Sequence, residues 1–332
     1  MTAIAVLGAG SWGTTLGNLL AAKGEPVRLW AYEAEVVEAV NRSHENSLFL
    51  PGVPLCTSLR AYTDAVDAVR GARVVVSASP SHAVRGVVRR VASSVAPGAL
   101  VVSATKGIET ESLALMSEVF GECLPQGRFV ALSGPSFAIE VAQGQPTAVV
   151  AAATDEAAAL DAQRLFATST FRVYSGSDVV GVELAGALKN VIAVAAGILE
   201  GLGLGHNPRA ALITRGLAEI TRLGLAMGAD PLTFAGLAGM GDLVLTTTGS
   251  LSRNRALGVA LAQGETLEHH RLTHRTVAEG ANTSRAGVAL GARYGVELPI
   301  IQKVCEVLFE GKPARDAVPE LMERELKAEQ WR

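Results

Sequence analysis

The chain has 332 residues, more than one ordinary domain contains, so we expect two domains. Its residues are 49% apolar, which is enough for large cores. Its formal net charge is −3 and its lysines and arginines are scattered, which argues against nucleic acid or an anionic membrane as the main partner. We expect its apolar segments to be too short to span a membrane, and the first residues lack the basic stretch of a secretory signal, so a cytoplasmic protein without stable membrane insertion is predicted.

A glycine-rich turn follows the first apolar run. Residues Ala3 to Leu7 are typical of a short buried strand, and the pattern G-x-G-x-x-G follows at Gly8, Gly10 and Gly13. Glycines at this spacing permit a tight turn and a close approach of the backbone to a pyrophosphate at a helix N-terminus. A leucine stripe and a Lys-Gly stop predict that helix, and Val27 to Ala31 predicts the next strand. This context favours a dinucleotide-binding unit over a chance glycine turn.

Strand-like and helical runs alternate up to about residue 175. The alternation predicts an α/β fold with a doubly wound, mostly parallel Rossmann-type sheet. After Tyr174 the pattern is helical, so an all-helical domain is expected to follow. We place the boundary near residue 180, which gives a dinucleotide-binding domain over 1–180 and a helical substrate-binding domain over 181–332. The strands are expected at Ala3–Leu7, Val27–Ala31, Arg73–Ser77, Leu100–Ser103, Phe129–Leu132, Ala148–Ala152 and Phe171–Tyr174.

Polar residues follow three of these strands, at the edge where ligands of open sheets bind. They are Ser79-Pro80-Ser81, Thr105-Lys106-Gly107 and Ser133-Gly134-Pro135-Ser136. A lysine that leaves the end of a buried strand is suited to hold an anionic or carbonyl-bearing substrate, and a solvated loop lysine is the ordinary alternative. The spacing alone leaves both interpretations of Lys106 open.

An apolar helix is expected around Leu184 to Val194, and one pair, Lys189-Asn190, interrupts it. A cation in such a helix either extends its stem to a surface or serves a site, because burial of its charge is costly. Burial also lowers a lysine pKa toward neutrality, which a general acid for ketone reduction requires. The pattern therefore favours a catalytic role for Lys189.

A third cluster lies further along the chain. Asp242 follows a Gly-Met-Gly turn, Thr246 comes four residues later, and Ser252-Arg253-Asn254 comes next. Ser252 suits a helix N-cap, and a helix beginning there would present free N–H groups beside the Arg253 guanidinium, which is a compact site for a phosphate ester. A capped surface helix with ordinary basic residues, and an Asx-turn at Asp242, are the alternatives.

The histidines and cysteines do not support metal or disulfide chemistry. His270 and His274 are four residues apart, but no carboxylate or cysteine stands at a metal-site spacing, so we expect a solvated loop and no metal. Cys56, Cys123 and Cys305 are odd in number and widely spaced, so they are expected to be core thiols.

The chain closely resembles the bacterial type of NAD(P)-dependent glycerol-3-phosphate dehydrogenase over nearly its whole length. The stretches that carry the resemblance are GAGSWGT, ATKGIE, SGPSFAIEVAQGQPTA, GVELAGALKNVIAVAAGILEGLGLG, TRGLAEI, GMGDLVLT, SRNR and VAEGANT. The resemblance implies reversible hydride transfer between NADPH or NADH and C2 of dihydroxyacetone phosphate, giving sn-glycerol 3-phosphate for phospholipid synthesis. The partner is then a small-molecule phosphate ester, and a homodimer is compatible with the resemblance.

The resemblance also implies roles for single residues. Lys189 would be the catalytic acid/base, and the residues that line the substrate carbonyl and hydroxyls would be Lys106, Asn190, Asp242 and Thr246. The phosphate would meet Ser252, Arg253 and Asn254, and Gly134 and Ser136 would contribute to the substrate pocket. The implied cofactor contacts are Gly8, Gly10, Ser11, Trp12, Gly13, Tyr32, Glu33, Lys106, Ala138, Arg253, Val277 and Glu279.

Two other functions remain open from the residues alone. A reductase of a 2-keto or 3-hydroxy acid would share the first domain, but it needs a cation placed for a carboxylate, whereas Ser252-Arg253-Asn254 suits a phosphate ester. A nicotinamide-sensing binding protein would have no need for a buried cation such as Lys189.

The choice of cofactor depends on the end of the second strand. Many members of the family carry basic residues there, but this chain has Tyr32-Glu33, with Glu33 at the spacing expected of an acidic ribose reader. We therefore expect that both cofactors are used, with weaker discrimination against NADH than a basic turn would give.

Overall fold

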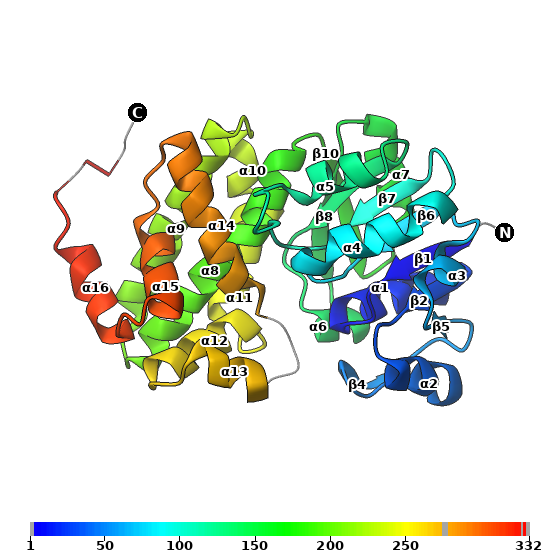
Figure 1. Ribbon diagram of the computed structural model, residues 1–332, viewed down its shortest axis with the longest axis horizontal. Coiled ribbons are helices and arrows are strands. Elements are labelled where there is room, and N and C mark those ends of the chain that lie inside the picture. Colours follow the sequence, from blue (N-terminus) through cyan, green and yellow to red (C-terminus); the bar gives the residue numbers. More distant parts are fainter. Residues whose placement is uncertain (1–2, 274–277, 327, 330–332) are drawn as a thin grey trace.

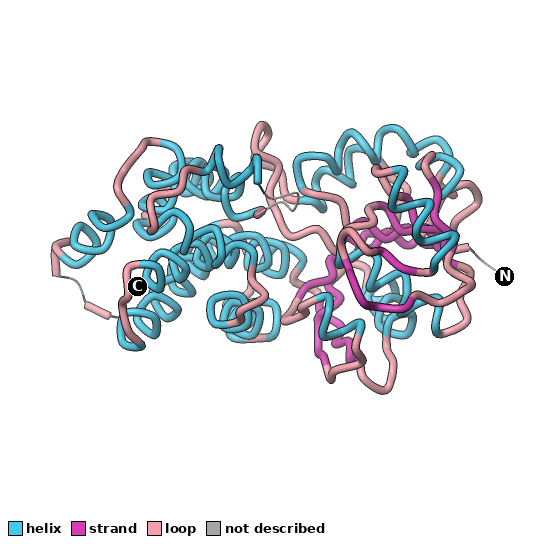
Figure 2. Tube along the Cα trace, turned by 90° about the horizontal axis from the view of Figure 1, so that it is seen from below, coloured by secondary structure: helices cyan, strands magenta, loops and turns pink. Residues whose placement is uncertain are grey.

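The computed structural model describes residues 3–273, 278–326 and 328–329. The molecule consists of a sheet with flanking helices and, beside it, a group of helices (Figures 1 and 2). All strands lie in one half of the molecule, and the other half is helical (Figure 2). The eight strands of the main sheet lie in the order β10 (Phe171–Gly176), β9 (Thr147–Ala152), β8 (Arg128–Ser133), β7 (Leu100–Ser103), β6 (Val74–Ser77), β1 (Ile4–Leu7), β2 (Val27–Trp30) and β5 (Arg60–Tyr62).

The sheet is doubly wound about β1. The chain runs from β1 to β2 and β5 on one side, then crosses back to β6 and continues toward β10 on the other side. All neighbouring strands are parallel except β8 and β9, which pair in an antiparallel manner. The gap between the carboxyl ends of β1 and β6 is therefore the switch point at which doubly wound sheets bind ligands.

Alternating residues of the strands pack on the two faces of the sheet. In β1, Ile4 and Val6 belong to one apolar core, and Ala5 and Leu7 belong to another. Strands covered on both faces are apolar throughout, which explains the β-branched runs of the sequence. The flanking helices are α1 (Ser11–Ala22), α2 (Ala34–Ser43), α3 (Ala65–Val69), α4 (Ser81–Val91), α5 (Met116–Cys123), α6 (Ala138–Ala142) and α7 (Glu156–Phe166), with a 3₁₀ turn at Ala92–Ser94.

Several sequence expectations need correction. The edge strand β5 and a small hairpin of β3 (Glu45–Asn46) and β4 (Leu50–Pro54) were not expected, because β3 and β5 are too short for a readable pattern and β4 contains two prolines and a glycine. Of the three cysteines, which are all free, only Cys305 is buried, and Cys56 and Cys123 are partly exposed.

The helical part is built around α8 (Val179–Gly201), which packs against α9, α11, α12, α14 and α15. The expectation that no segment is long enough to span a membrane is wrong for α8, which could cross one by length and composition. However, 89% of the most apolar stretch of α8 is buried inside the protein. It is the core helix of this part. The remaining helices are α9 (His206–Ala226), α10 (Pro231–Ala235), a π-helical turn (Leu237–Gly241), α11 (Asp242–Thr248), α12 (Arg253–Ala262), α13 (Leu267–Thr273), α14 (Glu279–Tyr294), α15 (Pro299–Phe309) and α16 (Ala314–Met322).

Helix α12 lies in backbone contact with α8. A Cβ on Gly258 would lie 2.0 Å from the carbonyl oxygen of Val194, so no larger residue fits at this crossing. The close approach fixes the N-terminus of α12 relative to Lys189, which precedes Val194 on α8 by about one and a half turns. We propose the domain division 1–180 and 181–332 on the change from β10 to α8, and the two largest apolar cores fall on its two sides almost entirely.

Candidate active site

The glycine-rich turn has the geometry of a phosphate cradle. Gly8 has a φ of +109°, which favours glycine, and a Cβ on Gly13 would lie 1.9 Å from the carbonyl oxygen of Gly8. At Gly10, the N-cap of α1, a Cβ would meet nothing within 4 Å, and no side chain caps the helix. The free N–H groups of α1 therefore face open space, which is the environment that a pyrophosphate requires.

A cavity of about 1040 Å³ joins this cradle to the helical part. Small-molecule sites commonly have volumes of about 300 to 1,000 Å³, so this one has room for a dinucleotide with a small substrate. The predicted site residues that line it are Gly8, Gly10, Ser11, Trp12, Tyr32, Glu33, Lys106, Ser136, Ala138, Lys189, Asn190, Thr246, Ser252, Arg253, Asn254 and Glu279.

Three predicted site residues lie behind this surface, and one predicted site residue, together with a histidine that was considered for a metal, lies outside the described residues. Gly13 packs against the carbonyl oxygen of Gly8, and the carbonyl oxygen of Gly134 accepts a hydrogen bond from Lys106. Asp242 is only 1% exposed. Val277 and His274 are not among the described residues. The sequence did not predict a cavity role for Trp30, Phe49, His82 and Phe137, because their contribution depends on loops that meet only in the folded chain.

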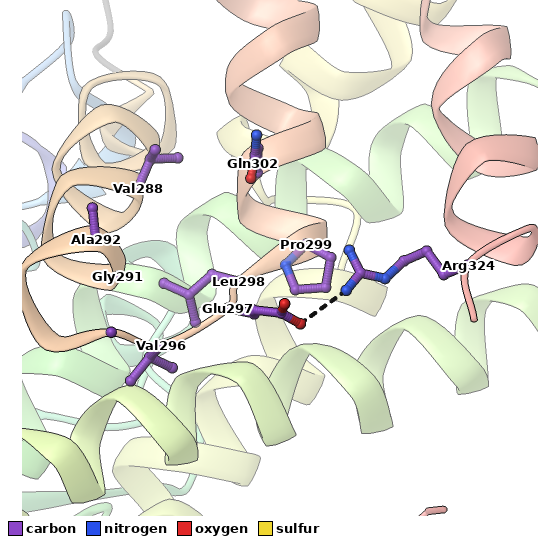
Figure 3. Close-up of a pocket in the computed structure, with 10 residues that line it drawn as sticks. Val288, Gly291, Ala292, Val296, Glu297, Leu298, Pro299, Gln302 and Arg324 are labelled. Atoms are coloured by element: carbon purple, nitrogen blue, oxygen red, sulfur yellow. Dashed lines mark hydrogen bonds and ion pairs between the residues drawn. The ribbon is translucent and has the colours of Figure 1, made fainter. Parts of the chain in front are cut away.

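A second pocket, of about 350 Å³, lies between the end of α14 and the start of α15 (Figure 3). Its lining is mostly apolar, and the ion pair between Arg324 and Glu297, at 3.0 Å, is largely exposed. It contains none of the predicted site residues. The large cavity is therefore the candidate active site.

Two lysines converge on one buried carboxylate at the edge of the large cavity. The ammonium nitrogen of Lys189, on α8, lies 2.6 Å from Oδ1 of Asp242 and 2.6 Å from the hydroxyl oxygen of Thr246. The ammonium nitrogen of Lys106, which follows β7, lies 2.7 Å from Oδ2 of Asp242 and 2.9 Å from the carbonyl oxygen of Gly134. Two ammonium groups on one carboxylate leave an excess positive charge at the cavity.

The pKa of Lys189 is lowered to about 8. Burial is the largest cause, and the Lys106 charge lowers the pKa further, while Asp242 opposes both effects. Lys189 is only 6% exposed although it lines the cavity. A buried amine with a pKa near neutrality can both release and take up a proton at working pH.

A chain of asparagines holds three helices together beside Lys189. The amide nitrogen of Asn254, on α12, donates to the side-chain oxygen of Asn190, on α8, at 3.0 Å. The backbone N–H of Gly280, in the first turn of α14, donates to the side-chain oxygen of Asn254 at 2.9 Å. The amide nitrogen of Asn190 lies 3.4 Å from the carbonyl oxygen of Lys106. The asparagines thus tie the positions of α8, α12 and α14 to the strand end that carries Lys106.

The two arginines of the Ser-Arg-Asn-Arg segment differ sharply. Ser252 caps α12 by accepting from the N–H of Arg255, whose guanidinium forms two 2.7 Å hydrogen bonds with the Glu200 carboxylate. Arg253 lines the cavity, and in the described part of the chain no ion pair joins its guanidinium to a carboxylate. Desolvation by the cavity wall lowers the pKa of Arg253 although the side chain is exposed, and the Glu279 charge opposes this effect. Arg253 is exposed, and a guanidinium that stays open to the cavity at a helix N-terminus is a strong anion site.

Glu279 links the two halves of the molecule across the cavity. Its carboxylate, at the start of α14, accepts from the backbone N–H of Ser81 at 3.0 Å and from the Ser81 hydroxyl at 2.7 Å. Sequence analysis singled out Ser81 only as a residue after a strand, because a contact between positions 198 residues apart leaves no local signal.

The remaining predicted cofactor residues lie around the cradle. The Ser11 hydroxyl donates to the carbonyl oxygen of Phe49 at 2.6 Å, and the Trp12 ring lies 6.4 Å from the Phe171 ring. Tyr32 is 85% exposed, and Glu33 is the N-cap of α2 without a side-chain capping bond. Among the described residues there is no group of three histidine, cysteine or acidic side chains that could hold a metal ion.

Comparisons with known proteins identify the family of the chain. Residues 3–159 match the model of the NAD-dependent glycerol-3-phosphate dehydrogenase N-terminus, and residues 178–319 match that of the C-terminus. A glycerol-3-phosphate dehydrogenase [NAD(P)+] of Geobacter sulfurreducens is 58% identical over 331 residues, which cover 99% of each chain. One from the Hildenborough strain of Nitratidesulfovibrio vulgaris is 52% identical over 98% of this chain and 99% of its own.

A solved structure extends the likeness to three dimensions. The crystal structure of glycerol-3-phosphate dehydrogenase from Coxiella burnetii superposes with a TM-score of 0.94 at 39% identity, over 97% of this chain and 99% of that one. Both halves of the chain are matched, in fold and in sequence. The chain therefore belongs to the NAD(P)-dependent glycerol-3-phosphate dehydrogenases, enzymes that interconvert dihydroxyacetone phosphate and sn-glycerol 3-phosphate with NAD(H) or NADP(H).

Proposed function

We propose that Lys189 exchanges the proton in this reaction, that Lys106 stabilises the charge that develops on the substrate oxygen, and that Arg253 holds the phosphate. The observation that carries the proposal is the convergence of two ammonium groups on the buried Asp242 carboxylate at the cavity edge. A ketone that accepts a hydride becomes an alkoxide, and an alkoxide needs a proton and nearby positive charge.

The cradle at Gly8 to Gly13 fits a dinucleotide, because its N–H groups are open and no side chain fills it. When bound, the nicotinamide supplies a hydride to C2 of dihydroxyacetone phosphate, or removes one from sn-glycerol 3-phosphate. Ser11, Trp12, Ala138 and Glu279 are the further residues that we propose hold it, since they line the same cavity.

Lys189 carries the exchangeable proton at Nζ. Its pKa of about 8 gives a mixed population of ammonium and amine near neutral pH, so the same group can donate in reduction and accept in oxidation. Asp242 and Thr246 hold the nitrogen in place, and Lys106 keeps a second positive charge close to the reacting oxygen.

Arg253 and the N-terminus of α12 form the proposed phosphate site. Ser252 caps this helix, Asn254 ties it to α8, and the Arg253 guanidinium is the charged group left for a ligand. Binding energy from the phosphate then orients C2 toward the proton donor, although the phosphate itself does not react. Ser136 completes the wall of this pocket in the proposal, and Gly134 supports it from behind, because its carbonyl oxygen accepts hydrogen bonds from Lys106 and Ser136.

We further propose that the enzyme supplies glycerol phosphate for phospholipid synthesis in the cytoplasm, and that it acts as a homodimer. The free cysteines are consistent with a reducing compartment. Light scattering on the purified protein measures the oligomeric state, and a monomer would contradict the proposed homodimer.

A substrate panel tests the proposed function. Oxidation of NADH and NADPH is followed with dihydroxyacetone phosphate, and pyruvate and 2-ketopantoate serve as carboxylate-bearing controls. We expect turnover with the phosphate ester and at most a trace with the two keto acids. Comparable turnover of either keto acid would show that the α12 site does not select a phosphate.

A further inference from the structure

The carboxyl end of β2 contributes an acidic side chain to the large cavity. Glu33 comes three residues after the end of β2 and lines the same cavity as Gly8 and Gly10. Because β2 is hydrogen-bonded to β1, with Trp30 opposite Leu7, this end lies directly beside the glycine turn. In doubly wound sheets, the residue at this place meets the ribose of the adenosine half of a dinucleotide.

The Glu33 carboxylate is left for a ligand. Glu33 is the N-cap of α2, but its side chain makes no capping hydrogen bond. No hydrogen bond or ion pair of its carboxylate is found in the described part of the chain. The preceding residue, Tyr32, is 85% exposed and also lines the cavity, so a bound adenine has an aromatic surface to cover.

The arginines of β2, α2 and the neighbouring strand β5 are engaged in other contacts. The Arg28 guanidinium donates to the carbonyl oxygens of Arg70 at 2.7 Å and of Asp67 at 3.4 Å. Arg42 pairs with Glu38 on the surface of α2 at 2.9 Å. Arg60, on the neighbouring strand β5, donates to two carbonyl oxygens of its own loop.

Among the described residues, the cations that line the cavity are carried by elements other than β2 and α2. In the described residues they are Lys106, Lys189 and Arg253, with the imidazole of His82. Lys106 follows β7, three strand positions from β2, which corresponds to about 14 Å at the usual strand spacing. Lys106 and Lys189 both donate hydrogen bonds to the Asp242 carboxylate. The pKa of Arg253 responds to the charge of Glu279, and the Glu279 carboxylate accepts a hydrogen bond from Ser81, which follows β6. His82 follows β6 as well.

We propose that Glu33 makes NADH the preferred cofactor of this enzyme. The carboxylate accepts a hydrogen bond from the 2′-hydroxyl of the adenosine ribose, and it repels the 2′-phosphate of NADPH, which meets no cation of the described residues at this end of the cavity. Selection thus combines an attractive contact to one cofactor with a repulsive contact to the other. The inference rests on the cofactor-binding role proposed for the Gly8–Gly13 turn.

The test compares kcat/KM for NADH and NADPH at saturating dihydroxyacetone phosphate in wild type, Glu33→Gln and Glu33→Arg. We expect a preference for NADH of about tenfold or more in wild type. The preference should shrink in Glu33→Gln and reverse in Glu33→Arg. Glu310→Arg is the matched control, because it makes the same charge change at an exposed position that does not line the cavity, and its preference should equal that of wild type.

Equal or better use of NADPH by wild type would overturn the inference, and so would an unchanged preference in Glu33→Arg. Direct titration of both cofactors by nicotinamide fluorescence gives the same comparison without turnover, in wild type and in Glu33→Gln, so a misfolded Glu33→Arg leaves the test intact. A protein that binds NADH selectively but does not turn over dihydroxyacetone phosphate would contradict the proposed function while supporting the role of Glu33.

Discussion

The two halves of the molecule contribute to the cavity in different ways. The sheet half presents mainly backbone: a glycine turn, the free N–H groups of α1, and strand ends with few charged side chains. The helical half presents charged side chains held in an apolar setting, with Lys189 and Asp242 almost fully buried and Arg253 at a capped helix start. A phosphate chain is met by helix N–H groups that carry no net charge, whereas proton transfer needs a group whose pKa burial has changed.

The comparison predicts that a change in the helical half can stop the chemistry and spare cofactor binding. Lys189→Ala should lower kcat for reduction by about 10²- to 10⁴-fold, the usual contribution of general acid catalysis. Asp242 keeps Lys106 as a partner, so its carboxylate is not left unpaired in the variant. Fluorescence titration should give an unchanged Kd for the cofactor. A variant that keeps more than about a tenth of wild-type kcat would assign the proton to another group.

Arg253→Ala should raise KM for dihydroxyacetone phosphate by about 10- to 100-fold, because a charge-assisted contact to an anion is lost. The weak reduction of unphosphorylated dihydroxyacetone should be nearly unchanged, because this substrate has no phosphate to lose. Steady-state kinetics on the two substrates measures the difference. Equal losses on both would indicate that Arg253 is needed for the structure or for the cofactor instead.

The sheet half should show the opposite behaviour. Gly10→Ala fits the backbone, since Gly10 has a φ of −65° and its Cβ would meet nothing within 4 Å, but the methyl group occupies the space where a pyrophosphate approaches. We expect KM for the cofactor to rise by about tenfold with kcat at saturation retained. An unchanged KM would mean that the cofactor does not approach this turn closely.

The smallest effect concerns stability at the junction of the halves. Burial raises the pKa of Glu183 on α8 to about 8, against the opposing effect of two hydrogen bonds from Ser117 at the start of α5. A carboxyl group whose folded pKa is raised stabilises the fold below its unfolded pKa, and this contribution is lost as pH rises toward 8. Glu183→Gln should therefore flatten the decrease in melting temperature between pH 5 and 9, with kcat unchanged. A decrease as steep as that of wild type would contradict the assignment.

Local patterns were enough for much of the fold and for part of the site. Seven strands of the main sheet were predicted because most contain a run of apolar residues, whereas β5, with three residues, has too little pattern to detect. Lys189 was conspicuous because a single lysine interrupts an apolar helix. The sharing of Asp242 by two lysines could not be read locally, because Lys106, Lys189 and Asp242 come from three distant segments. The contact between Ser81 and Glu279 was missed for the same reason.

The central claim, that Lys189 is the proton-exchanging group, is tested most directly by the pH dependence of kcat/KM in both directions, since this quantity reports pKa values of the free enzyme. Reduction needs the ammonium form and oxidation needs the amine. Between pH 7 and 10, kcat/KM for reduction should therefore fall, and kcat/KM for oxidation should rise, around a common pKa of about 8. Both transitions should be absent from the residual activity of Lys189→Ala. Transitions that persist in this variant, or flat profiles in wild type, would contradict the account.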